Sequence, residues 1–158
     1  PLRDYVVKQA QATPRFIKLL TENSLHWKVP FNWFGSLETK ELDGKKIIDI
    51  KMQGTAIVVD AARIYSLAHG IAAVNTRERL AAVGRALNVS EAESMGWIAS
   101  FEYLQTLRLA AQIDGHAIGG NPNAVDVEQL NSVDKTILRE SLSKVRNLQQ
   151  QLELDYVR

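Results

Sequence analysis

The N-terminal part of the chain carries apolar residues at the three-to-four spacing of an amphipathic helix. This spacing runs over residues 2–12 and again from Pro14 to about Lys28. Thr13 before Pro14 is typical of a helix N-cap followed by proline in the first turn, and Pro30 stops the second helix. The pattern therefore predicts two consecutive helices.

The period changes to two between residues 34 and 52, which is the spacing of a β-strand. Asp43-Gly44 lies in the middle of this stretch and is a strong signal for a two-residue hairpin turn. In the second strand of the hairpin, Asp49 and Lys51 share one face because strand residues alternate between faces. Apolar residues occupy the other face, which we expect to lie on the helices.

Helical spacing returns after the hairpin, from Thr55 to Ala111, and again from Ser132. A glycine- and asparagine-rich loop over residues 114–131 separates the last helix from the others. Asn75 and Ser90 each precede a glutamate by three residues, which is typical of a capping box. The predicted helix starts are Thr55, Asn75, Ser90 and Ser132. The expected fold is mainly α: a helical bundle with one inserted β-hairpin at about residues 34–52, forming a single domain over residues 1–158.

Composition narrows the functional classes. Nineteen basic and eighteen acidic residues leave a net charge of +1, so no broad electrostatic surface for nucleic acid or membrane is expected. The chain has no cysteine, which excludes thiol catalysis, disulfides and thiolate metal sites. No apolar run approaches the ~20 residues that span a bilayer. We expect a cytoplasmic location and, since the sequence begins with Pro1, a piece of a longer multidomain protein.

Two charged pairs lie beside apolar residues in the middle of the chain. Asp49 and Lys51 share a predicted strand face, and Asp60 and Arg63 have the i,i+3 spacing of neighbours on a helix surface. They are either solvated ion pairs, each contributing ~0.2–1 kcal/mol to stability, or ligand contacts. Spacing alone leaves both interpretations open.

Two helix starts in the same region are candidates for anion binding. Gly54 precedes a predicted helix whose first N–H groups, at residues 55–57, favour phosphate. Arg77 and Arg79 lie in the first turn of the next helix, where the helix dipole disfavours cations. Glu78 offers a structural compensation, whereas a guanidinium clamp for phosphate or carboxylate is the functional alternative.

The remaining polar and aromatic residues form no catalytic set. The three histidines, His26, His69 and His116, lie far apart in the sequence and lack the spacing of metal ligands. No nucleophile elbow and no phosphate-binding loop is present. The tryptophans are most simply packing residues, with Phe31-Asn32-Trp33-Phe34 a candidate interface. The residues alone predict a helical binding module with a polar site and no bound cofactor or metal.

Residues 48–67, IDIKMQGTAIVVDAARIYSL, resemble a known family. The segment is similar to the nucleotidyltransferase substrate-binding domain found at the C-terminus of bacterial proteins with cyclic-nucleotide-binding, CBS and nucleotidyltransferase modules. Residues 75–80, the Trp33-Phe34-Gly35 entry and the glutamine-rich last helix also fit. A more distant similarity links the segment to protein-PII uridylyltransferases and glutamine synthetase adenylyltransferases. Ile57 and Ala61 depart from the family pattern in packing rather than in charge.

The resemblance implies an accessory domain that helps an upstream catalytic domain bind nucleotide or acceptor and does not catalyse alone. Nucleoside triphosphate and Mg²⁺ are then expected in the full-length protein, held by aspartates of the catalytic domain. The alternative is a regulatory or homodimerising module that relays signals, suggested by the aromatic loop and by Gln149, which interrupts the last apolar stripe. The expected substrate-binding residues are Asp49, Lys51, Gly54, Asp60, Arg63, Asn75, Thr76 and Arg79.

Overall fold

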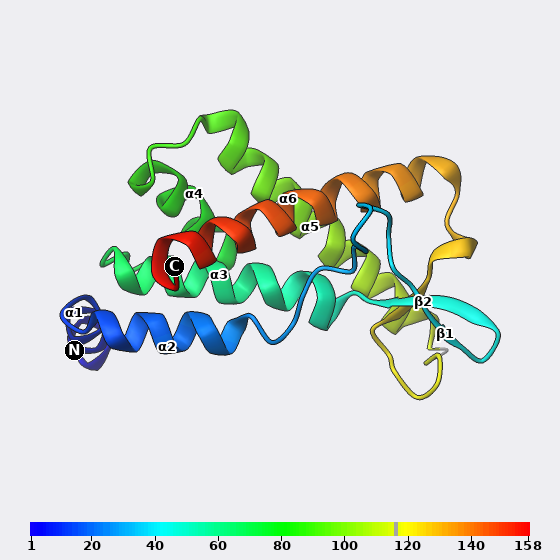
Figure 1. Ribbon diagram of the computed structural model, residues 1–158, viewed down its shortest axis with the longest axis horizontal. Helices are drawn as coiled ribbons and strands as arrows, with labels where there is room; N and C mark the ends of the chain where they lie inside the picture. Colours follow the sequence, from blue (N-terminus) through cyan, green and yellow to red (C-terminus); the bar gives the residue numbers. More distant parts are fainter. Residues whose placement is uncertain (116) are drawn as a thin grey trace.

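The computed structural model describes residues 1–115 and 117–158, and its fold is mainly α, as predicted. The helices of the described chain are α1 (Leu2–Gln11), α2 (Pro14–Ser24), α3 (Ala56–Ala68), α4 (Thr76–Ala86), α5 (Glu91–Asp114) and α6 (Ser132–Tyr156). The short elements are β1 (Lys40–Leu42), β2 (Lys45–Asp49), the π-helix η1 (Lys51–Thr55), β3 (Ala124–Asp126) and the 3₁₀ turn η2 (Val127–Gln129). Figure 1 shows the sheet at one end of the bundle and both chain ends at the other.

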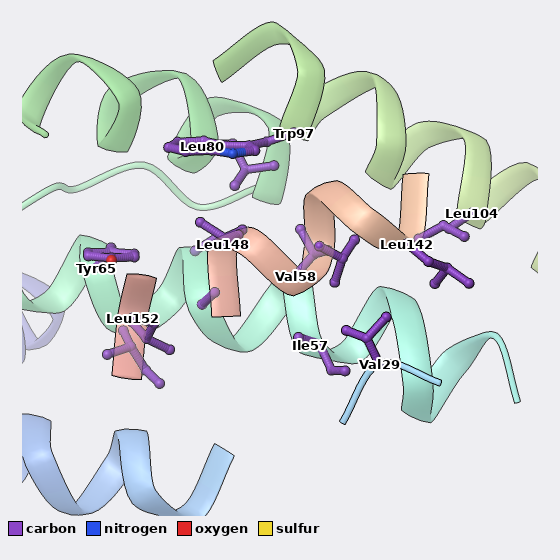
Figure 2. Packing of buried hydrophobic residues seen from close by; sticks show 14 of the residues in the cluster. Val29, Ile57, Val58, Tyr65, Leu80, Trp97, Leu104, Leu142, Leu148 and Leu152 are labelled. Atoms are coloured by element: carbon purple, nitrogen blue, oxygen red, sulfur yellow. The ribbon is translucent and has the colours of Figure 1, made fainter. Parts of the chain in front are cut away.

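Helix α3 is the centre of the bundle and contacts α1, α2, α4 and α6. Its composition explains this position, because apolar or small residues on most of its circumference leave little surface that prefers water. Ile64 and Tyr65 are fully buried, and Val58 is 1% exposed. Burying one such side chain contributes about 1.5–3 kcal/mol. Figure 2 shows α3 and α6 contributing side chains to one continuous core.

The β-hairpin forms around the predicted turn but is shorter than expected. Asp43 and Gly44 both have positive φ, 52° and 73°, as a tight hairpin turn requires. Within residues 34–52 only 40–42 and 45–49 are strands, so the prediction that strands fill this stretch is wrong in extent. The chain leaves the sheet after Asp49 because η1 begins at Lys51 and continues directly into α3.

A third strand, β3, completes the sheet from within the segment that the sequence predicted as a loop. It pairs antiparallel with β2, in the register Ile48 to Val125, and gives the strand order β1-β2-β3. Val125 is 8% exposed and joins the core, and residues 119–120 and 122–123 before this strand are turns. The inserted element is therefore a three-stranded antiparallel sheet rather than a hairpin alone.

Helix starts follow the predicted caps closely. The Asn75 side chain accepts a hydrogen bond from Glu78 N at 2.9 Å, and Ser90 Oγ accepts one from Glu93 N at 3.1 Å. Thr13 occupies the N-cap position of α2, but its hydroxyl donates to the carbonyl of Gln9 instead. Helix α2 ends at Ser24, four residues before the expected Lys28.

The early end of α2 is tied to the residue that interrupts the apolar stripe of α6. Gln149 is 5% exposed, and its Nε2 donates to the carbonyl of Trp27 at 2.8 Å. This carbonyl lies just beyond α2, where no helical partner is available. The polar residue in the stripe therefore joins α6 to the α2 end within this fold. Among the described residues, no helix is both long and apolar enough to cross a membrane.

Replacing Gln149 with leucine extends the apolar stripe, yet we expect it to destabilise the protein. Gln149→Leu leaves the Trp27 carbonyl without its donor, which should lower the free energy of unfolding by about 1–3 kcal/mol. Urea unfolding measures this change. Gln150→Leu is the control, since Gln150 is exposed and should change little. Equal or greater stability of Gln149→Leu would contradict the role of this bond.

Candidate functional site

The residues predicted for one site lie in two groups along α3. Asp49, Lys51 and Gly54 precede the helix at the sheet end of the bundle, whereas Arg63 lies beyond its middle. Lys51 and Arg63 are twelve residues apart, which at about 1.5 Å per residue is ~18 Å along the helical path. The expected convergence of strand edge and two helix starts on a single site therefore does not occur.

In the sheet-end group, Asp49 is held by bonds within the protein. One carboxylate oxygen accepts from Met52 N at 2.9 Å, and the other accepts from Asn121 Nδ2, also at 2.9 Å. The backbone N–H of Asp49 donates to Gln53 Oε1 at 3.0 Å. Asp49 thus caps η1 and holds the loop before β3 against the end of β2.

The expected shared strand face of Asp49 and Lys51 is wrong, because Lys51 is the first residue of η1 rather than a strand residue. The predicted free N–H groups at the start of α3 are also wrong. Thr55 N donates to Ile50 O at 2.9 Å, and Ala56 N donates to Lys51 O. Since η1 runs directly into α3, these donors are already satisfied and offer no anion site.

Gly54 is buried at the crossing of η1 with α5 and α6. A Cβ atom at this position would lie 3.4 Å from Leu104 Cδ1 and 3.7 Å from Leu142 Cδ2. The glycine permits close approach, as its type suggested, but the neighbours are two fully buried leucines. Its observed contacts are core contacts.

In the second group, Arg3 of α1 and Arg79 of α4 meet at the carbonyl of Ala73, and Arg63 of α3 is close enough for its charge to act on Arg79. Arg79 Nε donates to this oxygen at 3.0 Å, and Arg3 donates to it at 2.7 Å. Arg63 pairs with Asp60 at 2.8 Å, at the spacing predicted from the sequence. We call Arg3, Arg63 and Arg79 the arginine cluster.

The electrostatics of the arginine cluster favour an anion. Burial, and then the neighbouring charges of Arg3 and Arg63, lower the pKa of Arg79 from its usual value. Burial raises the pKa of Asp60, and the Arg63 charge opposes this shift. Three guanidiniums and one carboxylate have a formal sum of +2 at neutral pH. Guanidiniums bind phosphate and carboxylate groups through two parallel hydrogen bonds.

Neighbouring residues at the start of α4 have other contacts. Arg77 pairs with Glu102 on α5, so the predicted clamp of Arg77 with Arg79 does not form in this structure. Asn75 caps α4, and Thr76 is half-buried in its first turn. These residues fix the direction of α4 and with it the position of Arg79 Nε over Ala73.

Sequence patterns did not identify Arg3 as part of this group. It lies in α1, sixty residues before Arg63, and joins the cluster only because α1 packs against α3. No local spacing carries that information; a basic residue early in a predicted helix is the sole signal.

Metal binding has no support in the described part of the chain, where no group of three potential ligands gathers. His26 Nδ1 lies 2.8 Å from Asn23 O, and His69 Nε2 lies 3.4 Å from the Tyr156 hydroxyl. His116 lies outside the described residues. The Tyr65 hydroxyl donates to Asp155 at 2.6 Å, joining α3 to the end of α6 in a contact that the sequence did not indicate.

Comparison with known proteins supplies a family. A family model described as a putative nucleotidyltransferase substrate binding domain matches residues 14–156. No curated protein and no solved structure matched the chain in the same comparisons. The matched range contains every residue predicted for the site, whereas Arg3 lies before it.

Replacing Asp49 with alanine tests its structural role. Asp49→Ala removes the cap of η1 and the bond to Asn121, so the free energy of unfolding should fall by about 1–2 kcal/mol. Lys51→Ala is the control and should change stability by less than about 0.5 kcal/mol, because Lys51 is exposed. Chemical denaturation compares the two. Equal stability of both variants would show that these bonds contribute nothing.

Replacing Arg63 tests the ion pair within the arginine cluster. The Arg63 charge holds the pKa of Asp60 below the value that burial alone would give, so Arg63→Gln should raise this pKa further. Carboxyl-detected NMR titration measures the change. Arg85→Gln, at the exposed far end of α4, should leave the Asp60 pKa unchanged. An Asp60 pKa that stays constant or falls in Arg63→Gln would contradict the pairing.

Proposed function

Because the chain belongs to the family of putative nucleotidyltransferase substrate-binding domains over residues 14–156, we propose that it is the accessory substrate-binding domain of a nucleotidyltransferase. It binds part of the nucleotide or of the acceptor for an upstream catalytic domain of the adenylyl- or uridylyltransferase type. The family match is the observation that carries this proposal. The absence of a complete catalytic set in the sequence supports a role in binding rather than in chemistry.

The arginine cluster is the part of the surface that we propose for an anionic substrate group. Arg63 and Arg79 contact the phosphate or carboxylate, Arg3 adds a third charge, and Asp60 orients Arg63. Nucleotidyl transfer uses substrates rich in phosphate, and guanidiniums bind phosphate with two parallel hydrogen bonds. An excess of cations over carboxylates is what such a substrate requires.

The other predicted residues have supporting roles in this proposal. Asn75 and Thr76 position the start of α4, while Asp49 and Gly54 fix where α3 begins and so set the place of Arg63. Lys51 is exposed in η1, which leads into the end of α3 away from Arg63, and there it is available to a neighbouring domain. Nucleoside triphosphate and Mg²⁺ belong to the catalytic domain, whose metals stabilise the transferring phosphoryl charge.

Kinetics of a protein that contains both this chain and its catalytic domain test the proposal. Arg63→Gln and Arg79→Gln should each raise the KM for at least one of the two substrates by about tenfold, the effect of losing one charged hydrogen bond. Initial rates with ATP or UTP, Mg²⁺ and the acceptor measure this change.

Arg85→Gln is the matched control, since it removes an exposed arginine from the same helix as Arg79. Its kinetic constants should equal those of the parent protein. If Arg63→Gln and Arg79→Gln remain folded and bind and turn over both substrates normally, the arginine cluster has no part in substrate binding. Circular dichroism of each variant establishes that it is folded.

A further inference from the structure

A concavity lies against α6, formed by the segment 28–33 after α2 and by residues 146–153 of the helix. Its volume is about 520 Å³, large enough for a ligand of several rings. Its walls combine aromatic side chains, carboxamides and charged groups from two segments that are distant in the sequence. None of these residues belongs to the arginine cluster.

The loop at the rim of this pocket is held in place while exposing two large aromatic side chains. Asn32 Oδ1 accepts from Phe34 N and from Ser36 N, both at 3.0 Å, and Asn32 N donates to Ser36 O at 2.8 Å. Gly35 has φ 79°, which closes the turn, and its carbonyl accepts from Arg139 at 3.3 Å. Trp33 is nonetheless 96% exposed and Phe34 90% exposed.

Such exposure of Trp33 is not explained by packing within the chain. A large aromatic side chain that the backbone holds in water loses the burial that normally stabilises it. Because Trp33 lines the pocket and Phe34 does not, the two neighbours differ in what they can contact. Trp33 therefore provides a flat apolar face at the mouth of the concavity.

The charged side chains that line the pocket differ in whether they have a partner of opposite charge. Glu153 lies 4.0 Å from Lys28 and 3.6 Å from Arg158, so two cations share this carboxylate. The Arg146 guanidinium stacks 4.4 Å from the centre of the Phe31 ring. No carboxylate of the described residues lies within 4.0 Å of it. Arg146 thus adds a positive charge, stacked on the Phe31 ring, to a pocket that Trp33 also lines.

From this combination we propose that the pocket binds a nucleoside phosphate. The base stacks on Trp33, since base–aromatic stacking accepts any base. The phosphate bonds to Arg146, which stacking on Phe31 already orients. A bare anion would not use the aromatic wall, and an uncharged aromatic ligand would not use the cation.

The class of ligand rests on the proposed function, whereas the position of the site rests on the pocket itself. If the nucleotide occupies this pocket, the arginine cluster remains for the anionic group of the acceptor. Figure 1 shows the segment between α2 and β1 reaching α6 before it returns to the sheet, whereas the arginine cluster is built from α1, α3 and the start of α4. The two sites can therefore be tested separately.

Calorimetric titration of the 158-residue chain with ATP tests the aromatic half of the site. Trp33→Ala should weaken ATP binding by about tenfold, the effect of losing one stacked base. Phe34→Ala is the matched control, because Phe34 is equally exposed in the same turn but does not line the pocket. Its affinity should stay within about twofold of the parent protein.

The phosphate half is tested in the same assay with Arg146→Gln, which should also weaken ATP by about tenfold and reduce the salt dependence of binding. Lys135→Gln, an exposed cation on the same helix, should do neither. Adenosine and inorganic triphosphate should each bind more weakly than ATP, since each uses one half of the site.

The outcomes separate this inference from the proposed function. Undetectable ATP binding at millimolar concentration, or equal affinity in Trp33→Ala, Arg146→Gln and their controls, overturns the pocket assignment. If ATP binding is lost in Arg63→Gln but kept in Trp33→Ala, the nucleotide binds at the arginine cluster and only the pocket proposal fails. Loss confined to the pocket variants supports it.

Discussion

The structure depends on the burial of α3. Helices α1, α2, α4 and α6 pack on this one helix, so every functional residue is positioned relative to it. Gly54 brings its start against Leu104 and Leu142, and Asp49 caps the π-helix that leads into it. Because interiors are packed to near-crystalline density, a small shift of α3 would move every helix that lies on it.

Local signals in the sequence predicted much of this fold. Asp43-Gly44 indicated the turn, and the two capping boxes indicated α4 and α5, because each depends on residues within four positions of one another. The third strand and the π-helix escaped prediction. Strand β3 exists through pairing with residues more than seventy positions earlier, and a π-helix has no distinct apolar period.

In the candidate site, too, the sequence predicted the contact that depends on local spacing and not the one that depends on tertiary packing. The Asp60–Arg63 pair followed from its i,i+3 spacing, whereas Arg3 joined it only through tertiary packing. The sequence indicated that Gly54 permits a close approach, but it could not show whether the approaching group is a ligand or a neighbouring helix. Helix packing accounts for that glycine, and the arginine cluster retains the unbalanced charge that a substrate-binding surface needs.

The most direct test is the structure of this chain together with the catalytic domain that we propose as its partner, with a non-hydrolysable nucleotide, Mg²⁺ and the acceptor bound. The account predicts that α3 and α4 face the catalytic cleft, with Arg63 or Arg79 within hydrogen-bond distance of a substrate phosphate or carboxylate. A structure in which this surface points away from both substrates, with the cleft closed by another part of the protein, would contradict it.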